Sequence, residues 1–161
     1  MLIETGNSLI KAATLDLVSN FLTLEPSDEG FPETLFNDIL ALITNEFTDE
    51  SAIYAAGNLI GLNSDFANEL EHSIALDRIF EVAKRSAGCC SAFMSLLNRL
   101  VMTGMFNHLL FRFEEMNGLL IGGLFASFDK EAFIHVVIPK AINLFTLIID
   151  QEPSLTTSIF D

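Results

Sequence analysis

Apolar residues recur at helical spacing along nearly the whole chain, and this pattern limits the fold most strongly. Three groups occupy positions i, i+3, i+4 and i+7: Phe36, Ile39, Leu40, Ile43; Leu76, Ile79, Phe80, Ala83; and Phe93, Leu96, Leu97, Leu100. Such spacing gathers apolar side chains on one face of an α-helix. No segment alternates as a half-buried strand would, so the sequence predicts an all-α protein of about nine helices separated by short turns.

Length and hydropathy indicate one domain that stays out of membranes. The 161 residues are 50% hydrophobic, but purely apolar stretches such as residues 118–128 are short. A membrane-spanning helix needs about 20 apolar residues. The first residues lack a basic flank and a small-residue cleavage site, so we expect neither secretion nor membrane insertion. A cytoplasmic or nuclear protein is the resulting prediction.

The cysteines and histidines predict no metal or cofactor site. Cys89 and Cys90 are adjacent, and a bridge between neighbouring helical residues would be strained, so we expect reduced, buried thiols. A redox switch made by these two thiols is the less favoured alternative. His72, His108 and His135 share no ligand spacing with the cysteines or with each other.

Charge is concentrated in the first half of the chain. Residues 1–77 contain 14 acids and one base, whereas residues 78–161 contain eight acids and seven bases, which together give the net charge of -14. Such a field repels nucleic acid and anionic lipid and favours a basic peptide or protein as partner. The alternative is that the acids only solvate helix surfaces.

Four asparagines mark an internal period. Asn20, Asn58, Asn98 and Asn143 lie in the similar stretches SNFLTL, GNLIGL, LNRLVM and INLFTL, and are separated by 38, 40 and 45 residues. Periods of this length are typical of helical solenoids. Each asparagine comes near the end of a predicted long helix, so the sequence predicts stacked helical repeats.

The segment YAAGNLIGLNSDFANELEHSIALDRIFEVA, residues 54–83, resembles the armadillo repeat. It has an aromatic residue four positions before an asparagine, an Asn-Ser helix break, a short helix and an Ala-Leu start to a longer one. The matching residues are Tyr54, Asn58, Leu59, Asn63, Ala75, Leu76 and Ile79. The resemblance extends more weakly over nearly the whole chain and implies a right-handed superhelix of about three and a half irregular repeats.

The resemblance also implies the positions of the repeats and helices. The units would be residues 1–24 (partial), 25–63, 64–103 and 104–150, followed by a tail at 151–161. Third helices, which line the concave groove of armadillo proteins, would span residues 9–24, 49–62, 88–103 and 130–150. Second helices would span 33–46, 74–85 and 118–128, and short first helices 65–72 and 105–116. Pro139 should kink the last long helix and open or bend the final repeat, because proline lacks an amide hydrogen.

The asparagines predict a peptide-binding groove. Residues four apart on a helix share a face, so Tyr54 and Asn58, followed by Gly61 or Leu62 one turn on, should form one exposed strip if the opposite side packs inward. A carboxamide has a donor and an acceptor and matches an extended main chain. The predicted groove residues are Asp16, Asn20, Glu50, Tyr54, Asn58, Met94, Asn98, His135 and Asn143. The alternative is that each asparagine bonds a neighbouring helix and fixes the stacking.

Function follows from this groove. We expect a non-catalytic module that binds a basic or extended peptide, because the sequence lacks a phosphate-binding loop or converging acid, base and nucleophile. One alternative is a structural subunit that docks through exposed solenoid ends in a larger complex or by self-association. Another is a closed helical bundle with an apolar groove for a partner helix or lipid.

Overall fold

The computed structural model describes residues 7–24, 33–43, 48–71, 74–104 and 130–151, and the single positions 118 and 153. Within these ranges the chain is helical and contains no strand. The all-α prediction is therefore confirmed. The elements are α1 (Ser8–Leu24), α2 (Glu33–Ala41), α3 (Asp49–Leu62), α4 (Asp65–Glu71), α5 (Ala75–Ala83), α6 (Ala87–Met102), α9 (Lys130–Ala132), the π-helical η2 (Phe133–Val137) and α10 (Ile138–Gln151).

The four expected third helices correspond closely to α1, α3, α6 and the helical run from α9 to α10. The short helix expected at 65–72 is α4, and the one expected at 74–85 is the slightly shorter α5. The helix expected at 33–46 ends earlier, at Ala41. Those expected at 105–116 and 118–128 lie outside the described residues, apart from position 118.

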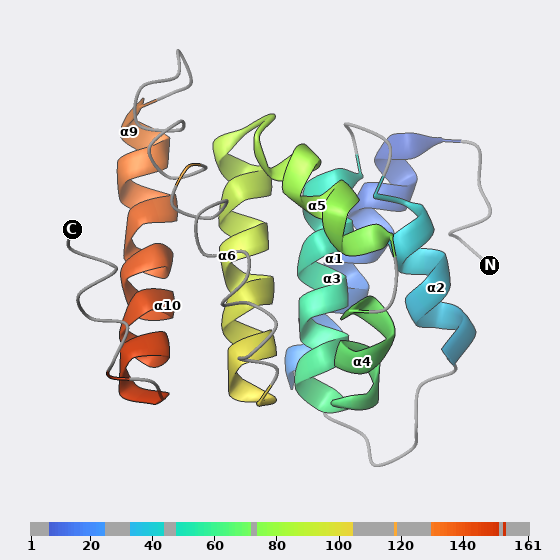
Figure 1. Cartoon of the computed structure of the whole chain (residues 1–161). Coiled ribbons are helices and arrows are strands. Elements are labelled where there is room, and N and C mark those ends of the chain that lie inside the picture. The colour runs from blue at the N-terminus through green and yellow to red at the C-terminus, as the bar shows by residue number, and fades with distance from the viewer. Residues whose placement is uncertain are drawn as a thin grey trace.

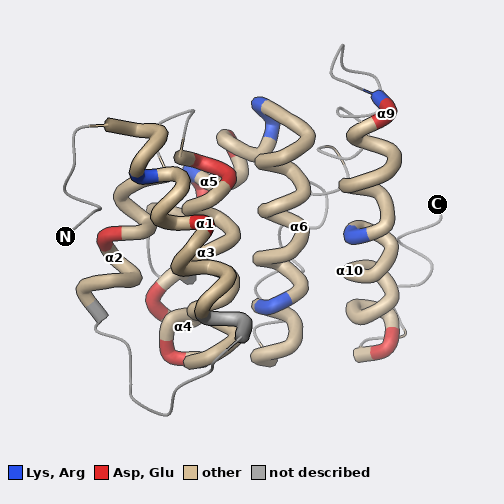
Figure 2. Tube along the Cα trace, turned by 180° about the vertical axis from the view of Figure 1, so that it is seen from behind, with Lys and Arg blue, Asp and Glu red and all other residues tan. Residues whose placement is uncertain are grey.

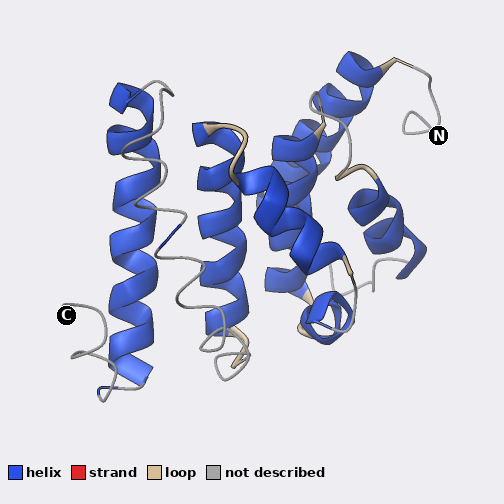
Figure 3. Cartoon of the chain, turned by 45° about the horizontal axis from the view of Figure 1, so that its top comes forward, coloured by secondary structure: helices blue, strands red, loops and turns tan. Residues whose placement is uncertain are grey.

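The long helices form a row in chain order. Figure 1 and Figure 3 show α3, α6 and α10 side by side, and Figure 1 shows α1 behind α3; the most extensive contacts between elements are those of α3 with α6, α1 with α3 and α10 with α6. The shorter helices α2, α4 and α5 pack against α3 and α6 as a second layer. On the side of α6 and α10 that faces away from this second layer, Figure 2 shows no described helix over them.

The core lies between the two layers and is almost entirely apolar. Phe36 of α2 stacks on Phe66 of α4 with ring centroids 4.7 Å apart. Phe80 of α5 meets Phe93 of α6 edge to face at 4.6 Å. Aromatic pairs of this kind add to the burial of apolar area. The Phe80–Phe93 pair therefore attaches α5 to the row, whereas the Phe36–Phe66 pair joins two helices of the second layer.

Before Pro139 the helix changes type, which differs from the kink that the sequence predicts. The five residues from Phe133 to Val137 are π-helical, and the amide of Ile138 donates to the carbonyl of Phe133. A π turn makes i to i+5 hydrogen bonds, so it widens the helix directly before the proline. The helix then continues through Pro139 to Gln151.

The helical run Lys130–Gln151 is also notable for its hydropathy. Its 22 residues have a hydropathy of 1.9 in their most apolar window, and by length and composition they could cross a membrane. Within the described part of the chain it is the one helix that meets this test, and 28% of the window is buried in the structure. The core helix of a soluble protein meets the same test.

Candidate functional site

The α3 helix has one partly exposed stripe, as the spacing of Tyr54, Asn58 and Gly61 predicts. Tyr54 and Asn58 are half-buried and Gly61 is exposed, while Ala55, Ala56 and Leu59 between them are buried. On α6 the residues that are at least partly exposed are Ala87 and Gly88 at its start and then Ser95, Asn98, Arg99 and Met102, so its stripe lies in the second half of the helix. The two stripes adjoin, because α3 and α6 are neighbours in the row.

Asn58 connects α3 to α1. Its Nδ2 donates to the Oγ of Ser19 at 2.6 Å and to the carbonyl of Ser19 at 3.2 Å. A carbonyl only accepts hydrogen bonds, so this contact fixes which end of the amide faces α1. Asn58 thus bonds a neighbouring helix, as the alternative role for the asparagines predicts.

Asn98 and Asn143 connect α6 to α10. The Nδ2 of Asn98 donates to the carbonyl of Met94 at 3.0 Å and to the carbonyl of Lys140 at 3.4 Å. The Nδ2 of Asn143 donates to the Oδ1 of Asn98 at 3.3 Å. These two asparagines therefore share one polar seam, whereas Asn58 belongs to another.

Three polar side chains from three helices meet beside Asn58. The hydroxyls of Tyr54 (α3) and Ser91 (α6) are 2.9 Å apart. The ammonium of Lys140 (α10) donates to the hydroxyl of Tyr54 and, at 2.8 Å, to that of Ser91. The same Nζ lies 4.6 Å from the centroid of the Tyr54 ring. The cluster ties α10 to α3 across α6, although Ser91 itself is only 1% exposed.

A small pocket lies next to this cluster, between α3 and α6. It has a volume of about 150 Å³ and is lined by Tyr54, Gly57, Asn58, Ser95, Leu96 and Arg99. Ligand pockets for drug-sized molecules usually have about 300–1,000 Å³. This one therefore has room for a single side chain or a chain terminus.

The remaining predicted groove residues are dispersed. Asp16 and Asn20 are exposed on α1, and His135 is exposed on η2. Glu50 is exposed on α3, where a Cβ at Gly88 would collide with its carboxylate, so the glycine leaves room for it. Met94 is fully buried, so its prediction as a groove residue is wrong. Its apolar thioether packs in the core instead.

Charge divides the molecule along the row. Acids are spread over the elements from α1 to α5, as Figure 2 shows. Arg99 is the single charged residue of α6, and Lys140 and Asp150 are those of α10. Acids thus outnumber bases over α1 to α5, whereas Arg99, Lys130 and Lys140 of the later helices are accompanied by Glu131 and Asp150.

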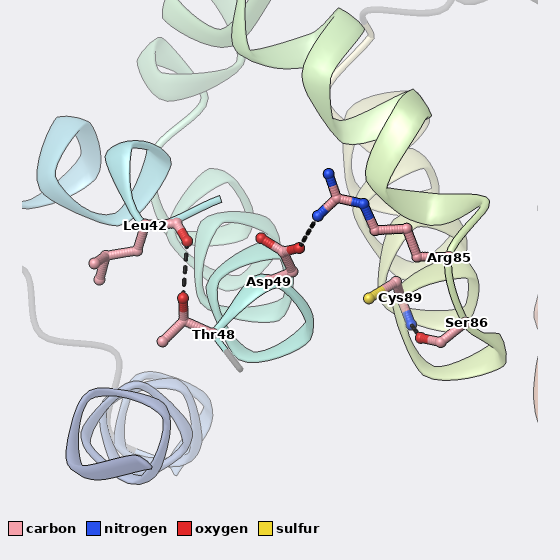
Figure 4. Close-up of polar contacts among 6 residues, drawn as sticks. All are labelled: Leu42, Thr48, Asp49, Arg85, Ser86 and Cys89. Carbon is pink, nitrogen blue, oxygen red and sulfur yellow. Dashed lines mark hydrogen bonds and ion pairs between the residues drawn. The ribbon is translucent and has the colours of Figure 1, made fainter. Parts of the chain in front are cut away.

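An ion pair with a buried carboxylate lies near the start of α6 beside the thiol of Cys89 (Figure 4), and Cys90 follows Cys89 in the same helix. Asp49 is fully buried, and its Oδ2 is 2.8 Å from Nη1 of Arg85. Burial raises the pKa of the Cys89 thiol, and the acids Asp49 and Glu50 raise it further against the lowering effect of its hydrogen bond with Ser86. Burial and the neighbouring Cys89 raise the pKa of Cys90 to about 12. Both cysteines are free and buried, as expected.

The described residues contain no group of three or more His, Cys, Asp or Glu side chains that could hold a metal ion. The chemistry that they offer at the α3–α6 seam consists of hydrogen bonding and cation contacts. A ligand there would be held by Arg99 and by polar groups of α3 and α6.

Sequence reasoning missed Ser19, Ser91, Ser95, Arg99 and Lys140. Lys140 could have been singled out in the sequence, because it is a cation within a mostly apolar helix. Ser91 and Ser95 are four apart on α6 and could have been placed on one face. The side-chain partners of Ser91 are 37 and 49 residues away in the chain, and Lys140 is 86 residues from Tyr54; no local pattern specifies such contacts.

Comparison of the chain with family models, with curated proteins and with solved structures gave no match. The class that the structure itself defines is an all-α protein with a row of long helices and a second, shorter layer.

Proposed function

We propose that the protein is a non-catalytic interaction module that binds an extended segment of a partner protein along the α1–α3–α6–α10 row. In this proposal the row is an armadillo-like superhelix of about three and a half repeats, and its open side is the concave groove. The single observation that supports it best is the adjoining pair of partly exposed stripes on α3 and α6, which contain Tyr54, Asn58 and Asn98.

The charge of the row suggests the orientation of the partner. Asp16 and Glu50 lie on α1 and α3, whereas Arg99 and Lys140 lie on α6 and α10. A basic stretch of the partner would therefore lie over α1 and α3, where attraction is screened by salt. Tyr54 would contact aliphatic stems or cations of the segment.

A Lys/Arg-rich peptide without aromatic residues tests this function. The chain has one tyrosine and no tryptophan, so the intrinsic fluorescence reports on Tyr54 directly. We expect salt-sensitive binding that Asp16→Asn/Glu50→Gln weakens about tenfold, since each removed surface charge contact is worth about 0.7 kcal/mol. Asp38→Asn/Asp65→Asn is the matched control, because it removes two exposed charges outside the row.

The Tyr54→Ala/Asn58→Ala variant tests the groove itself and is followed with a peptide that carries its own label. Loss of binding is expected because both side chains lie on the α3 stripe. Identical binding by this variant, or binding that ignores salt, would rule out the proposed groove.

A structural subunit is the second candidate function, supported by an exposed apolar row on α1. Leu9, Ala13, Leu17 and Phe21 lie four residues apart, and Leu17 and Phe21 are 68% and 57% exposed. Such a row would dock α1 onto a partner or a second copy. Light scattering should detect an assembly that Leu17→Glu/Phe21→Glu dissociates, and a monomeric native protein that co-purifies with nothing would contradict this function.

A further inference from the structure

The guanidinium of Arg99 has no ion-pair partner among the described residues. The ion pairs of that part of the chain are Lys84 with Glu81 and Arg85 with Asp49. Arg99 is half-buried and lines the pocket between α3 and α6. In a protein with a net charge of -14, a half-buried cation with no counter-ion in the described part of the chain is unusual, because partial desolvation of a charge must be offset by hydrogen bonds or an opposite charge.

The position of this guanidinium is set by a glycine. A Cβ at Gly61 would lie 3.3 Å from Cδ and 3.4 Å from Nε and Nη1 of Arg99. The side chain therefore crosses α3 over the bare backbone of Gly61. Asn58 lies three residues earlier on the same helix, and side chains at that spacing are about 5–6 Å apart.

The neighbouring groups in the pocket offer acceptors. The Nδ2 of Asn58 is committed to Ser19, which leaves its Oδ1 for a donor. The Oγ of Ser95 donates to the carbonyl of Ser91 at 3.2 Å, so it too can accept. The hydroxyl of Tyr54 is already engaged by Lys140 and Ser91. The pocket thus combines the cationic donors of the Arg99 guanidinium with two acceptors about one helical turn away, Oδ1 of Asn58 and Oγ of Ser95.

A second cation strengthens the attraction for an anion. Lys140 contacts Tyr54 on the pocket wall. The exposed acid on the same α3 stripe is Glu50, eight residues before Asn58, which is about 12 Å along the helix axis. The local field at the pocket is therefore set by Arg99 and Lys140.

We infer that this pocket binds the last residue of an extended peptide, with its terminal carboxylate on Arg99 and its main-chain N–H on Oδ1 of Asn58. An arginine binds a carboxylate through two parallel hydrogen bonds. In a C-terminal residue one carbon separates the N–H from the carboxylate, which suits a donor fork and an acceptor on adjacent turns. The volume of about 150 Å³ accommodates such a residue and little more. The inference rests on the proposed function in taking this side of the row as the binding surface.

N-acetylalanine is the probe, since it carries one amide N–H and one terminal carboxylate. We expect millimolar binding, with amide shifts in an NMR titration confined to α3 around Asn58 and α6 around Arg99. Arg99→Gln should weaken it about tenfold or more, because hydrogen bonds to charged groups are the stronger ones. Arg99→Lys, which keeps the charge but not the fork, should bind with intermediate affinity. Arg78→Gln on α5 removes an exposed cation and should change nothing.

Two further probes separate the contacts. N-acetylalanine amide lacks the carboxylate and acetate lacks the N–H, so both should bind much more weakly. No binding of N-acetylalanine, equal binding of either analogue, or equal binding by Arg99→Gln would overturn the inference. These probes carry no basic group, so their failure is distinct from failure of the Lys/Arg-rich peptide to bind.

Discussion

At the scale of single residues, the adjacent cations Lys84 and Arg85 differ in the burial of the acid with which each forms an ion pair. Arg85 pairs with the fully buried Asp49, whereas Lys84 pairs with Glu81, and both of those side chains are more than half exposed. Arg85→Ala should lower the free energy of unfolding by about 2 kcal/mol, because it leaves a buried carboxylate without its cation. Lys84→Ala should change it by less than about 0.5 kcal/mol. Urea unfolding of both variants measures the difference, and equal effects would contradict this account.

The thiol of Cys90 provides a pH dependence of known sign. Its pKa is raised from 9.0 to about 12 by burial, so above pH 9 the unfolded chain loses a proton that the folded chain keeps. Stability is therefore unaffected below pH 9 and falls between pH 9 and 12, by up to about 1.4 kcal/mol per pH unit. The Cys90→Ala variant should lose this part of the decline. Unfolding curves that run parallel for the two proteins across that range would refute it.

Residue roles were predictable only where they depend on the local helix. The spacing of Tyr54 and Asn58 indicated a shared, partly exposed stripe, and this is what the structure has. The partners Ser19 and Lys140 were not predictable, since the contacts cross 39 and 86 residues of chain. Met94 has the same spacing from Asn98 as Tyr54 from Asn58, yet it is buried. Its apolar side chain gains more in the core than on the stripe.

At the scale of helices, Gly57 and Gly61 allow a comparison on one element. A Cβ at Gly57 would lie 3.4 Å from the Cα of Leu96, so a larger side chain there meets the backbone of α6. Gly57→Leu should cost about 1–3 kcal/mol by forcing the helices apart. Gly61→Leu meets only the flexible side chain of Arg99 and gains up to about 1 kcal/mol of helix propensity. Denaturant unfolding of the pair should therefore give changes of opposite sign, and similar losses would contradict the close approach at Gly57.

Helix ends were predicted best where turn residues mark them. The Asn-Ser break gives the end of α3 and the start of α4 almost to the residue. The end of α2 was placed too late because the apolar spacing runs on to Ile43, which is buried although it lies in a turn after Ala41. Apolar periodicity in a sequence indicates which residues are buried, and a buried residue can lie beyond the end of the helix.

At the scale of the whole molecule, the uneven charge predicts a dependence on salt. The acids of the elements from α1 to α5 repel one another in the folded state, and raising the ionic strength from about 0.01 M to 0.15 M shortens the Debye length from about 30 Å to 8 Å. The free energy of unfolding should therefore rise with sodium chloride over that range, as measured by urea unfolding. Asp38→Asn/Asp65→Asn should reduce the rise, and a protein destabilised by salt would contradict this expectation.

The order of the long helices was the most predictable feature of the whole molecule. The asparagine period placed four helices that do pack as neighbours in chain order. The period did not show that Asn58 donates a hydrogen bond to the preceding long helix, α1, whereas Asn98 donates one to the following long helix, α10. Equal spacing in a sequence specifies equivalent positions, but the direction of each hydrogen bond depends on what the adjacent helix presents.

The wide turn before Pro139 also links the number of residues in this part of the helix to the identity of residue 139. Phe133 and Val137 are buried, and the three residues between them, Ile134, His135 and Val136, are exposed. If one of the three were deleted, the two buried side chains would be three residues apart and would still share a face. The narrower α turn would then press the carbonyl four residues back against the proline ring. We therefore expect the helix to tolerate deletion of one residue between Phe133 and Val137 only when Pro139 is also replaced.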